Sequence, residues 1–306
     1  MYDAIVVGGG PAGLSAALLL GRSRRTVLVC DTGEARNAAS HASHSFLTRD
    51  GTPPLELRRL GREQLATYPG VELTSSTVVD ACAEDDHFVT IHADGRRVAA
   101  RKLVLATGVR DELPAIEGLE ALWGRSVFHC PYCDGWEVRD QPLAVYPNTD
   151  DPALVMQAAL LIRQWSRDLI LLTNGPAPLD DESRSRLALF GITLREEPIV
   201  RVEGENGTLK QIVFASGDTL SRRAIFVRPR QAPRNELAVR LGCELSDDPP
   251  FPGLIRVDAS GQTTVQGVYA AGDVVTPIQQ VATAVSSGAV AGAMANLAMV
   301  MAHTSP

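Results

Sequence analysis

A glycine-rich turn near the N-terminus constrains the fold of this 306-residue chain more than any other feature. Residues 4–7 are apolar and predict a short buried strand, and residues 14–20 predict a helix. The turn between them consists of Gly8, Gly9, Gly10, Pro11, Ala12 and Gly13. Strand, G-x-G-x-x-G turn and helix in this order are typical of a dinucleotide-binding domain, because the glycines let a pyrophosphate approach the backbone N–H groups at the start of the helix.

A second predicted strand, residues 26–30, ends at Asp31, about 20 residues beyond the glycines. A carboxylate at this position can accept a hydrogen bond from a ribose hydroxyl of a bound nucleotide. Strand, glycines, helix, strand and acid together favour a ligand-binding turn over a glycine-rich turn without a ligand. They do not distinguish FAD from NAD.

Two distant segments complete a pattern seen in a known family. Residues 103–108 predict a buried strand ending in Ala106, Thr107 and Gly108, and residues 264–273 predict a strand ending in Gly272 and Asp273. With these segments the chain resembles the two-dinucleotide-domain flavoprotein disulfide reductases. The resemblance implies that the Ala-Thr-Gly turn lies by the nucleotide of FAD, that Asp273 hydrogen-bonds the ribityl chain, and that Gln279, Gln280 and Val281 run beside the isoalloxazine ring. It also assigns to the FAD site Arg36, Asn37 and Val79.

The two FAD-type segments enclose a second predicted domain. Residues 111–114 and 228–233 are rich in proline and polar residues and are plausible linkers. Between them we predict a strand at 142–146, a helix at 153–165, a strand at 169–173 and a hairpin around Asn206 and Gly207. The prediction is an α/β protein with two Rossmann-like domains: a discontinuous FAD domain, residues 1–113 and 230–306, and an inserted, degenerate dinucleotide-type domain, residues 114–229.

Composition and charge exclude some partners. The net charge of −7 argues against nucleic acid or an anionic membrane surface as the main partner. The N-terminus lacks the basic leader of a secretory signal, so we expect a cytoplasmic protein. Residues 274–302 carry no charge and could span a bilayer, but their glutamine, serine, glycine and asparagine residues favour a buried helix over a membrane span.

Two of the five cysteines, Cys130 and Cys133, are spaced for joint chemistry. In a reducing cytoplasm a C-x-x-C pair is more often catalytic than structural. Such a pair works when one sulfur is readily a thiolate and the other resolves the mixed disulfide. Half of a zinc site is the alternative, but no matching second pair of ligands follows. His41 and His44 also lack a third ligand, so we expect no metal site.

The motif C-x-x-C-D-G inside the inserted domain makes the whole chain resemble the low-molecular-weight thioredoxin reductases. By this resemblance Cys133 faces the flavin, Cys130 attacks the partner's disulfide, and Asp134 protonates the departing thiolate. The same resemblance implies a homodimer and thioredoxin or a similar dithiol protein as partner. A helix-capping role for Asp134 and a proton-transfer role for His129 remain open.

The chain departs from this family where NADPH should bind. The turn after residues 143–145 has no glycine, two prolines that lack N–H groups, and two acids, Asp150 and Asp151, where a pyrophosphate needs positive potential. The next strand end, residues 172–176, lacks arginine. We therefore predict that NADPH and NADH are poor electron donors. A diverged loop that still binds NADPH weakly is the alternative.

The source or acceptor of electrons is left open by this departure. The altered NADPH turn resembles that of the deeply rooted or ferredoxin-linked thioredoxin reductases, which keep flavin and cysteines without a pyridine nucleotide site. It is also compatible with flavin dithiol oxidases of natural-product pathways, which pass electrons to oxygen. A flavin redox sensor is the non-enzymatic alternative, and the intact Cys130, Cys133 and Asp134 argue against it.

Overall fold

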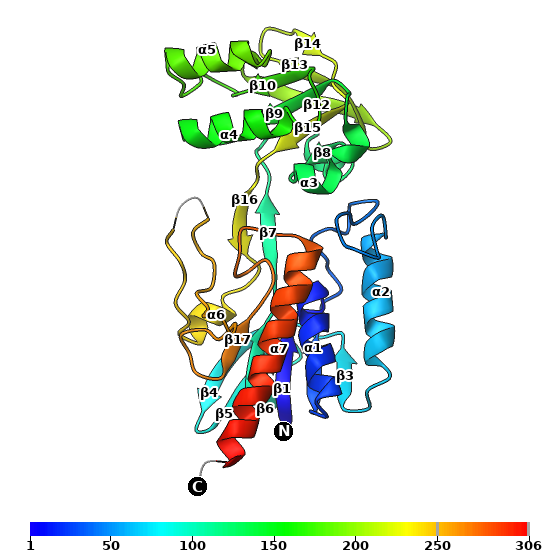
Figure 1. Ribbon diagram of the computed structural model, residues 1–306, viewed down its shortest axis with the longest axis vertical. Coiled ribbons are helices and arrows are strands. Elements are labelled where there is room, and N and C mark those ends of the chain that lie inside the picture. Colours follow the sequence, from blue (N-terminus) through cyan, green and yellow to red (C-terminus); the bar gives the residue numbers. More distant parts are fainter. Residues whose placement is uncertain (249–250, 305–306) are drawn as a thin grey trace. The chain divides into compact units, whose positions relative to one another are not determined.

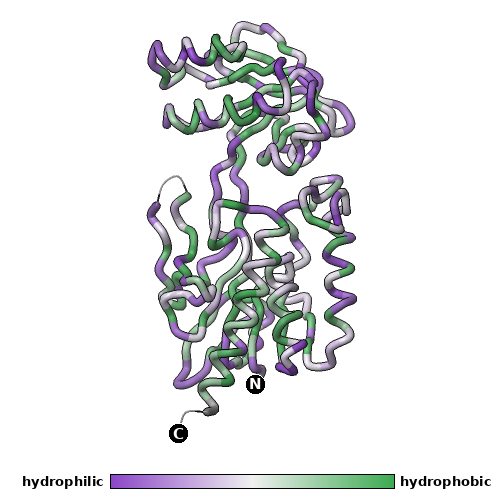
Figure 2. Tube along the Cα trace, viewed as in Figure 1, coloured by the Kyte–Doolittle hydropathy of each residue, from purple (hydrophilic) through white to green (hydrophobic). Residues whose placement is uncertain are grey.

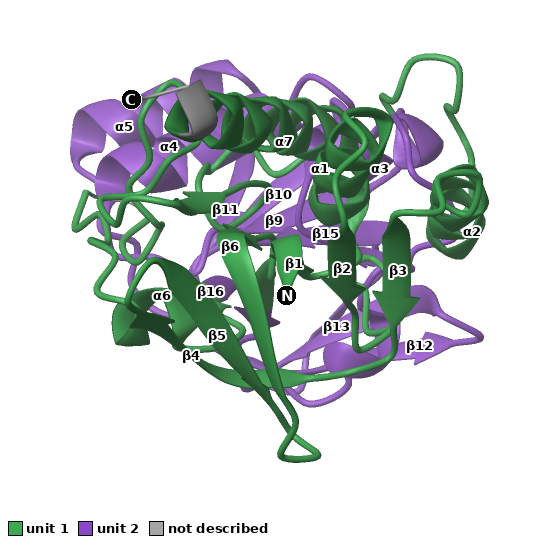
Figure 3. Ribbon diagram, turned by 90° about the horizontal axis from the view of Figure 1, so that it is seen from below, with its two compact units in different colours: residues 1–38, 45–110, 231–306 green, residues 39–44, 111–230 purple. Residues whose placement is uncertain are grey.

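In the computed structural model, which describes residues 1–248 and 251–304, the chain forms two compact units (Figures 1 and 3). Unit 1 comprises Met1–Ala38, Ser45–Arg110 and Gln231–Pro306, and unit 2 comprises Ala39–His44 and Asp111–Arg230. From the sequence we placed the divisions after residues 113 and 229. The grouping of residues 39–44 with unit 2 was not expected from the sequence, because these residues follow the second strand of the predicted FAD domain.

Unit 1 is a mixed sheet with helices. Its strands are β1 (Tyr2–Val7), β2 (Val27–Cys30), β3 (Val71–Thr74), β4 (Val78–Glu84), β5 (His87–His92), β6 (Arg97–Leu105) and β17 (Val268–Ala270), and its helices are α1 (Pro11–Arg22), α2 (Pro54–Leu65), α6 (Leu237–Arg240) and α7 (Val281–Thr304). The strand order is β3-β2-β1-β6-β5-β4, and β17 also pairs with β6. The β1, β2, β3, β6 and β17 pairings are parallel, whereas β4–β5 and β5–β6 are antiparallel.

The central strand β1 is apolar on both faces because it lies between two hydrophobic clusters. Ala4 and Val6 pack in the cluster that includes residues of α1 and α7, whereas Ile5 and Val7 pack in the cluster on the other face of the sheet. Figure 3 shows α1 and α7 together on one side of this sheet, and Figure 2 shows hydrophobic residues along these elements. The glycine-rich turn follows the last residue of β1 and therefore lies at the carboxyl edge of the parallel strands.

Helix α7 packs against α1 through small residues. A Cβ atom on Gly288 would lie 2.1 Å from the carbonyl oxygen of Ala12, and one on Gly292 would lie 2.6 Å from that of Ala16. Ser15 Oγ donates a hydrogen bond to the carbonyl of Val285 (2.7 Å). By length and composition alone residues 281–302 could cross a membrane. One face of this helix packs on α1 and contributes Ala284, Ala291, Ala295 and Met299 to the core of unit 1.

One predicted element of unit 1 is shorter than expected. Of residues 264–273, only β17 forms a strand. Gly267 has a φ of +89°, and the N–H of Val268 bonds the carbonyl of Val265 (3.0 Å), which makes a turn where the sequence indicated extended chain. The prediction over residues 264–267 was therefore wrong, because a glycine in the left-handed region ends the extended conformation.

Unit 2 contains a parallel sheet with strand order β11-β10-β9-β15-β8 and an antiparallel sheet with order β12-β13-β14. The strands are β8 (Val127–Phe128), β9 (Leu143–Tyr146), β10 (Leu169–Leu172), β11 (Thr193–Arg195), β12 (Ile199–Glu205), β13 (Thr208–Phe214), β14 (Thr219–Leu220) and β15 (Ala224–Val227), and the helices are η1 (Glu120–Leu122), α3 (Pro131–Asp134), η2 (Trp136–Val138), α4 (Pro152–Ile162) and α5 (Asp181–Leu189). The predicted hairpin is confirmed, because Asn206 and Gly207 both have positive φ between the paired β12 and β13.

Two short strands carry the chain between the units. β7 (Val109–Glu112) leads from unit 1 into unit 2, and β16 (Arg230–Pro233) leads back. The two strands pair with each other, and both are largely hydrophilic (Figure 2). The fold is thus an α/β architecture with two Rossmann-type units, as predicted.

Candidate active site

Two glycines of the glycine-rich turn, Gly8 and Gly13, pack directly against backbone carbonyl groups. Gly8 has a φ of +115°, and a Cβ there would lie 2.1 Å from the carbonyl oxygen of Ala106, at the end of β6. A Cβ on Gly13 would lie 1.8 Å from the carbonyl oxygen of Gly8. Both glycines are therefore required by the protein itself, whether or not a ligand is bound.

Gly10 differs from its neighbours. It has a φ of −79°, a conformation open to any residue, and a Cβ there would meet no atom of the described residues within 4 Å. It is the N-cap of α1, and in the part of the chain that the structure describes no side chain caps this helix start. The open space and the uncapped N–H groups fit the pyrophosphate of a dinucleotide such as FAD, which needs close backbone approach at a helix start.

Asp31, at the end of β2, is held by two arginines of α2. The buried Arg58 donates from Nη2 to Asp31 Oδ2 (2.7 Å), and Arg62 donates to the same oxygen. The N–H of Gly33 donates to Asp31 Oδ1 (3.1 Å). Burial alone would raise the pKa of this carboxyl, but the Gly33 N–H and the two arginines lower it below its ordinary value. Asp31 is thus a fixed carboxylate at the position predicted for a ribose acceptor.

Arg58 also ties the turn of residues 8–13 to the end of β2. Its Nε donates to the carbonyl of Gly9 (3.4 Å), and its Nη1 donates to the carbonyl of Gly33 (2.9 Å). One guanidinium therefore binds two backbone carbonyls and the Asp31 carboxylate, and joins the glycine-rich turn to residues 31–33. Sequence reasoning missed Arg58, because its distance from Asp31 along the chain gives no local signal.

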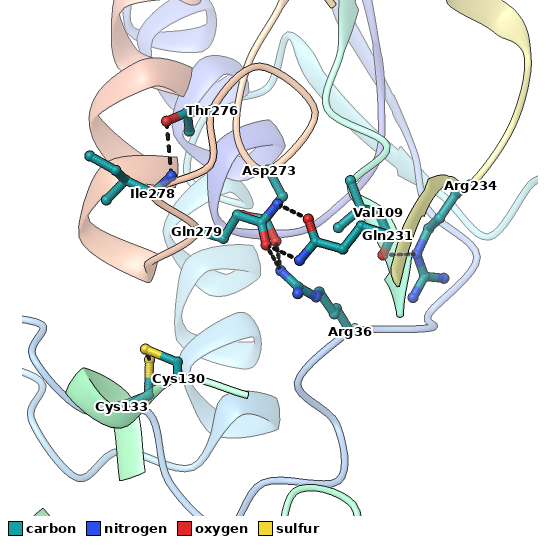
Figure 4. Close-up of polar contacts among 10 residues, drawn as sticks. All are labelled: Arg36, Val109, Cys130, Cys133, Gln231, Arg234, Asp273, Thr276, Ile278 and Gln279. Carbon is teal, nitrogen blue, oxygen red and sulfur yellow. Dashed lines mark hydrogen bonds and ion pairs between the residues drawn. The ribbon is translucent and has the colours of Figure 1, made fainter. Parts of the chain in front are cut away.

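Asp273 is paired with Arg36, another residue assigned to the FAD site. Arg36 Nη1 lies 2.9 Å from Asp273 Oδ2 and 2.6 Å from Gln279 Oε1 (Figure 4). Gln279 in turn exchanges two amide hydrogen bonds with Gln231 of β16 (2.7 Å each). The predicted residues Arg36, Asp273 and Gln279 therefore lie together in unit 1, with Gln231 as a neighbour that the sequence did not indicate.

The other residues assigned to the FAD site occupy edges and turns of unit 1. Thr107 and Gly108 follow β6, and Val79 lies on β4 with 46% of its side chain exposed. Gly272 has a φ of +82°, and a Cβ there would lie 2.9 Å from Cβ of Ala12, which brings the Gly272 turn against the glycine-rich turn. Gln280 directly precedes α7, Val281 is its first residue, and Asn37 lies in the loop after β2.

The two cysteines of the C-x-x-C motif lie at the start of α3 in unit 2. Cys130 is the N-cap, and the Sγ atoms of Cys130 and Cys133 are 2.6 Å apart (Figure 4). The thiol of Cys133 donates to Cys130, and this bond, with the backbone N–H groups of Cys133 and Tyr132, lowers the pKa of the Cys130 thiol although burial opposes the shift. The arrangement favours a thiolate at Cys130, as the attacking sulfur of a dithiol pair requires.

Asp134 directly follows the pair and is the last residue of α3. The helix cap is Cys130, so the capping alternative for Asp134 does not apply. Burial, and then the nearby Glu137 carboxylate, raises the pKa of Asp134 to about 7, while His44 opposes this shift. A carboxyl group that titrates near neutral pH can both give and accept a proton there.

His44 and His41 have different partners. His44 lies beside η2, with Nε2 3.5 Å from Glu137 Oε1. His41 instead accepts at Nε2 a hydrogen bond from Arg125 Nη1 (3.3 Å). Among residues 1–248 and 251–304, no group of three or more histidine, cysteine, aspartate or glutamate side chains could hold a metal ion. His129, half-buried before Cys130, remains a candidate from sequence alone.

The start of α4, where a pyrophosphate would bind in unit 2, is occupied by a side chain. Asp151 Oδ1 accepts hydrogen bonds from the N–H groups of Ala153 (2.8 Å) and Leu154 (3.4 Å). Pro152 follows as the first helical residue and has no N–H. A phosphate at this helix start would face a carboxylate in place of open N–H donors.

A hydrogen-bonded cluster fills the neighbouring strand ends. Asn148, with a φ of +49°, donates from Nδ2 to the carbonyl of Arg228 (3.2 Å) and accepts from the Tyr146 hydroxyl (3.2 Å). Asn174 Nδ2 donates to the same hydroxyl (3.4 Å), and its Oδ1 accepts from the N–H of Ile199 (2.6 Å). The side chains of Tyr146, Asn148 and Asn174 are therefore bonded to one another and to backbone groups at this edge of the sheet.

Similarity to known proteins extends over nearly the whole chain. Residues 2–288 match the family described as pyridine nucleotide-disulphide oxidoreductase. The chain is 32% identical to thioredoxin reductase sirT of Leptosphaeria maculans, over 97% of this chain and 94% of that protein, and 33% identical to thioredoxin reductase tcpT of Claviceps purpurea, over the same shares. The crystal structure of an oxidoreductase from Agrobacterium tumefaciens superposes with a TM-score of 0.91 at 36% identity, over 98% of this chain and 99% of that one.

Proposed function

The chain belongs to the pyridine nucleotide-disulphide oxidoreductase family, whose thioredoxin reductase-like members bind FAD, and we propose that it is an FAD-dependent thiol–disulfide oxidoreductase that works without NADPH. The observation that carries this proposal is the redox pair: Cys130 and Cys133 lie 2.6 Å apart, and the pKa of Cys130 is lowered by its partner. Asp134 beside them supplies the acid that thiol exchange needs.

Unit 1 has the residues to hold FAD. The open backbone at Gly10 suits the pyrophosphate, the fixed Asp31 suits the adenosine ribose, and Asp273 with its partner Arg36 suits the ribityl side. Bound FAD would supply a two-electron carrier for the cysteine pair.

The cysteines and Asp134 carry out the exchange. The Cys130 thiolate attacks one sulfur of the partner's disulfide, that S–S bond breaks, and the departing sulfur takes the proton of Asp134. Cys133 then attacks Cys130 in the mixed disulfide, which forms the Cys130–Cys133 bond and frees the second partner thiol. Two electrons pass from the pair to the partner. Run in reverse, the same steps oxidise a dithiol and reduce the pair.

The edge of unit 2 supports independence from NADPH. Asp151 occupies the start of α4, and the amides of Asn148 and Asn174 bond Tyr146 and backbone groups in place of a nucleotide. In an anaerobic titration followed by flavin absorbance, a dithiol should bleach the flavin and micromolar NADPH or NADH should not. Reduced ferredoxin, added in parallel, tests a protein electron donor. Rapid bleaching by NADPH would contradict the proposal.

The direction of electron flow separates two candidate functions. As a reductase, the photochemically reduced enzyme transfers electrons to thioredoxin or a similar dithiol protein. As a dithiol oxidase, it consumes one O₂ and releases one H₂O₂ for each dithiol oxidised. Because Asp151 occupies the helix start where NADPH would bind, the dithiol oxidase is worth testing in particular. In that function a dithiol replaces NADPH as the source of electrons. Thioredoxin reduction and oxygen uptake, measured on one preparation, distinguish the two.

A further inference from the structure

Gln231 lies on β16 and is the first residue of unit 1 after the chain returns from unit 2. Its side chain forms a reciprocal pair with that of Gln279, in which each amide donates from Nε2 to Oε1 of the other (2.7 Å each; Figure 4). Gln279 is 48 positions further along the chain, shortly before α7. Two hydrogen bonds between side chains therefore join the returning strand to the loop before α7.

The charge of Arg36 fixes the orientation of both amides. Arg36 Nη1 donates to Gln279 Oε1 (2.6 Å) as well as to Asp273 Oδ2 (2.9 Å). If the Gln279 amide were turned over, its nitrogen would face the guanidinium, donor against donor. Gln279 therefore keeps its oxygen toward Arg36, and Gln231 must present its own nitrogen to the same oxygen. Both lone pairs of that oxygen are then used.

The four side chains form a site that is ordered before any cofactor binds. Arg36 and Asp273 are 18% and 23% exposed, and the side chains of Gln231 and Gln279 are half-buried. Side chains that are already held in place lose less conformational entropy when a ligand binds to them. Each amide also keeps one N–H outside the reciprocal pair, because the pair uses only one of its two.

We propose that Gln231 is a positioning residue of the FAD site, which holds Gln279 and, through Arg36, Asp273 in the arrangement that FAD binds. Through Gln231 this site is also coupled to the strand that returns from unit 2. The inference rests on the proposed function for the presence of FAD in unit 1, and extends it to a residue outside the glycine-rich turn. Gln231 acts through Gln279 and is assigned no contact with FAD itself.

The pairing of β16 with β7 carries the coupling into both connecting strands. Arg234, the residue after β16, adds a side-chain contact, because its Nε donates to the carbonyl of Val109 on β7 (3.3 Å; Figure 4). The anchor at Gln231 therefore restrains two paired strands. Since a coupling free energy is reciprocal, order in these strands should favour FAD binding, and bound FAD should order the strands.

The test is a double-mutant cycle in FAD affinity with Gln231→Leu, Gln279→Leu and the double variant. Affinity is measured from the FAD that each holoenzyme releases on dilution. Leucine is close to glutamine in size but makes neither hydrogen bond. Gln231→Leu should weaken FAD binding at least about fivefold in the wild-type background and less than about twofold in the Gln279→Leu background. Equal losses in the two backgrounds, or no loss in the first, would overturn the positioning role.

Gln211→Leu is the matched control. Gln211 also uses its side-chain amide, which donates to Glu203 Oε2 (2.6 Å), but it lies on β13 of unit 2. FAD affinity in this variant should equal that of the wild type. A loss like that of Gln231→Leu would mean that removing any such amide weakens FAD binding, which contradicts a specific role for Gln231.

Hydrogen exchange measures the coupling without any assay of turnover. In the wild-type chain, saturating FAD should slow exchange of the backbone amides of β7 and β16, and this slowing should be lost in Gln231→Leu at saturating FAD. Equal slowing in the two proteins would contradict the coupling. A wild type that binds no FAD would refute the proposed function itself. If the wild type and Gln231→Leu bind FAD equally well, only the positioning role fails.

Discussion

Arg58 Nη2 lies 2.7 Å from Asp31 Oδ2, and both side chains are less than 10% exposed. The pair joins helix α2 to the end of β2, and the same arginine binds the carbonyls of Gly9 and Gly33. A buried ion pair of this kind fixes geometry at the nucleotide edge, and breaking it leaves an incompletely paired charge.

Arg58→Met should lower the free energy of unfolding by about 3 kcal/mol and weaken FAD binding by about tenfold or more. The neighbouring Arg59 is the control, since it is 53% exposed and pairs only with Glu56 and Glu63 among the described residues. Arg59→Met should cost less than about 1 kcal/mol and leave FAD affinity unchanged. Urea unfolding and flavin fluorescence titration give both quantities. Equal FAD affinity in the two variants would show that the Arg58–Asp31 ion pair is not needed for FAD binding.

Two glycines of the same turn should respond differently to alanine. Gly13→Ala places a Cβ 1.8 Å from a carbonyl oxygen and should destabilise the apoprotein by at least about 2 kcal/mol. The Cβ of Gly10→Ala meets no atom of residues 1–248 and 251–304 within 4 Å, so this variant should change the stability of the apoprotein by less than about 1 kcal/mol, yet weaken FAD binding by at least about tenfold. Apoprotein melting and FAD titration separate the two effects. Unchanged FAD affinity in Gly10→Ala would mean that the open space is not the pyrophosphate site.

The sulfurs of Cys130 and Cys133 should differ in reactivity. After anaerobic reduction at pH 7, limiting iodoacetamide should alkylate Cys130 before Cys133, because the pKa of Cys130 is lowered. Cys30 is an internal control: burial raises the pKa of its thiol to about 12, so it should remain unlabelled. Tandem mass spectrometry locates the label. Preferential labelling of Cys133 would reverse the roles assigned to the two residues.

The capping role of Asp151 predicts a local effect on stability. Asp151→Ala should cost about 1 kcal/mol, because two N–H groups at the start of α4 lose their acceptor. The adjacent Asp150→Ala should change stability by less than about 0.5 kcal/mol. Thermal melting of the wild type should also be insensitive to added NADPH, because the carboxylate holds the position of a phosphate. A clear rise in Tm with NADPH is the contrary result.

The raised pKa of Asp134 makes stability depend on pH. Its ordinary value is 3.8 and its value in the folded chain is about 7, so the unfolded chain loses this proton first as the pH rises. Asp134 therefore leaves stability unaffected below pH 4 and lowers it progressively up to pH 7, by about 1.4 kcal/mol per pH unit at most. Asp134→Asn should thus be more stable than the wild type at pH 8 and similar at pH 4. With FAD saturating, chemical unfolding at the two pH values measures this; Asp86→Asn, at a fully exposed site, should show no such difference.

Sequence alone determined the local features of this protein. The glycine pattern specified strand, turn and helix because such a turn packs against itself within a few residues, as Gly13 does against the carbonyl of Gly8. The C-x-x-C spacing placed two sulfurs at one helix start, and the prolines and acids of residues 147–152 indicated an altered nucleotide loop. Each of these depends on neighbours in the chain, so one sequence suffices to predict it.

Tertiary structure decided the partners of those features. Arg58 reaches Asp31 from another element, Arg36 reaches Asp273 from the opposite end of the chain, and residues 39–44 bring His44 to Glu137. Side chains far apart in sequence meet only when parallel strands align their ends and loops fold across them, and no local spacing records that meeting. The burial that raises the pKa of Asp134 likewise exists only once unit 2 has folded around it.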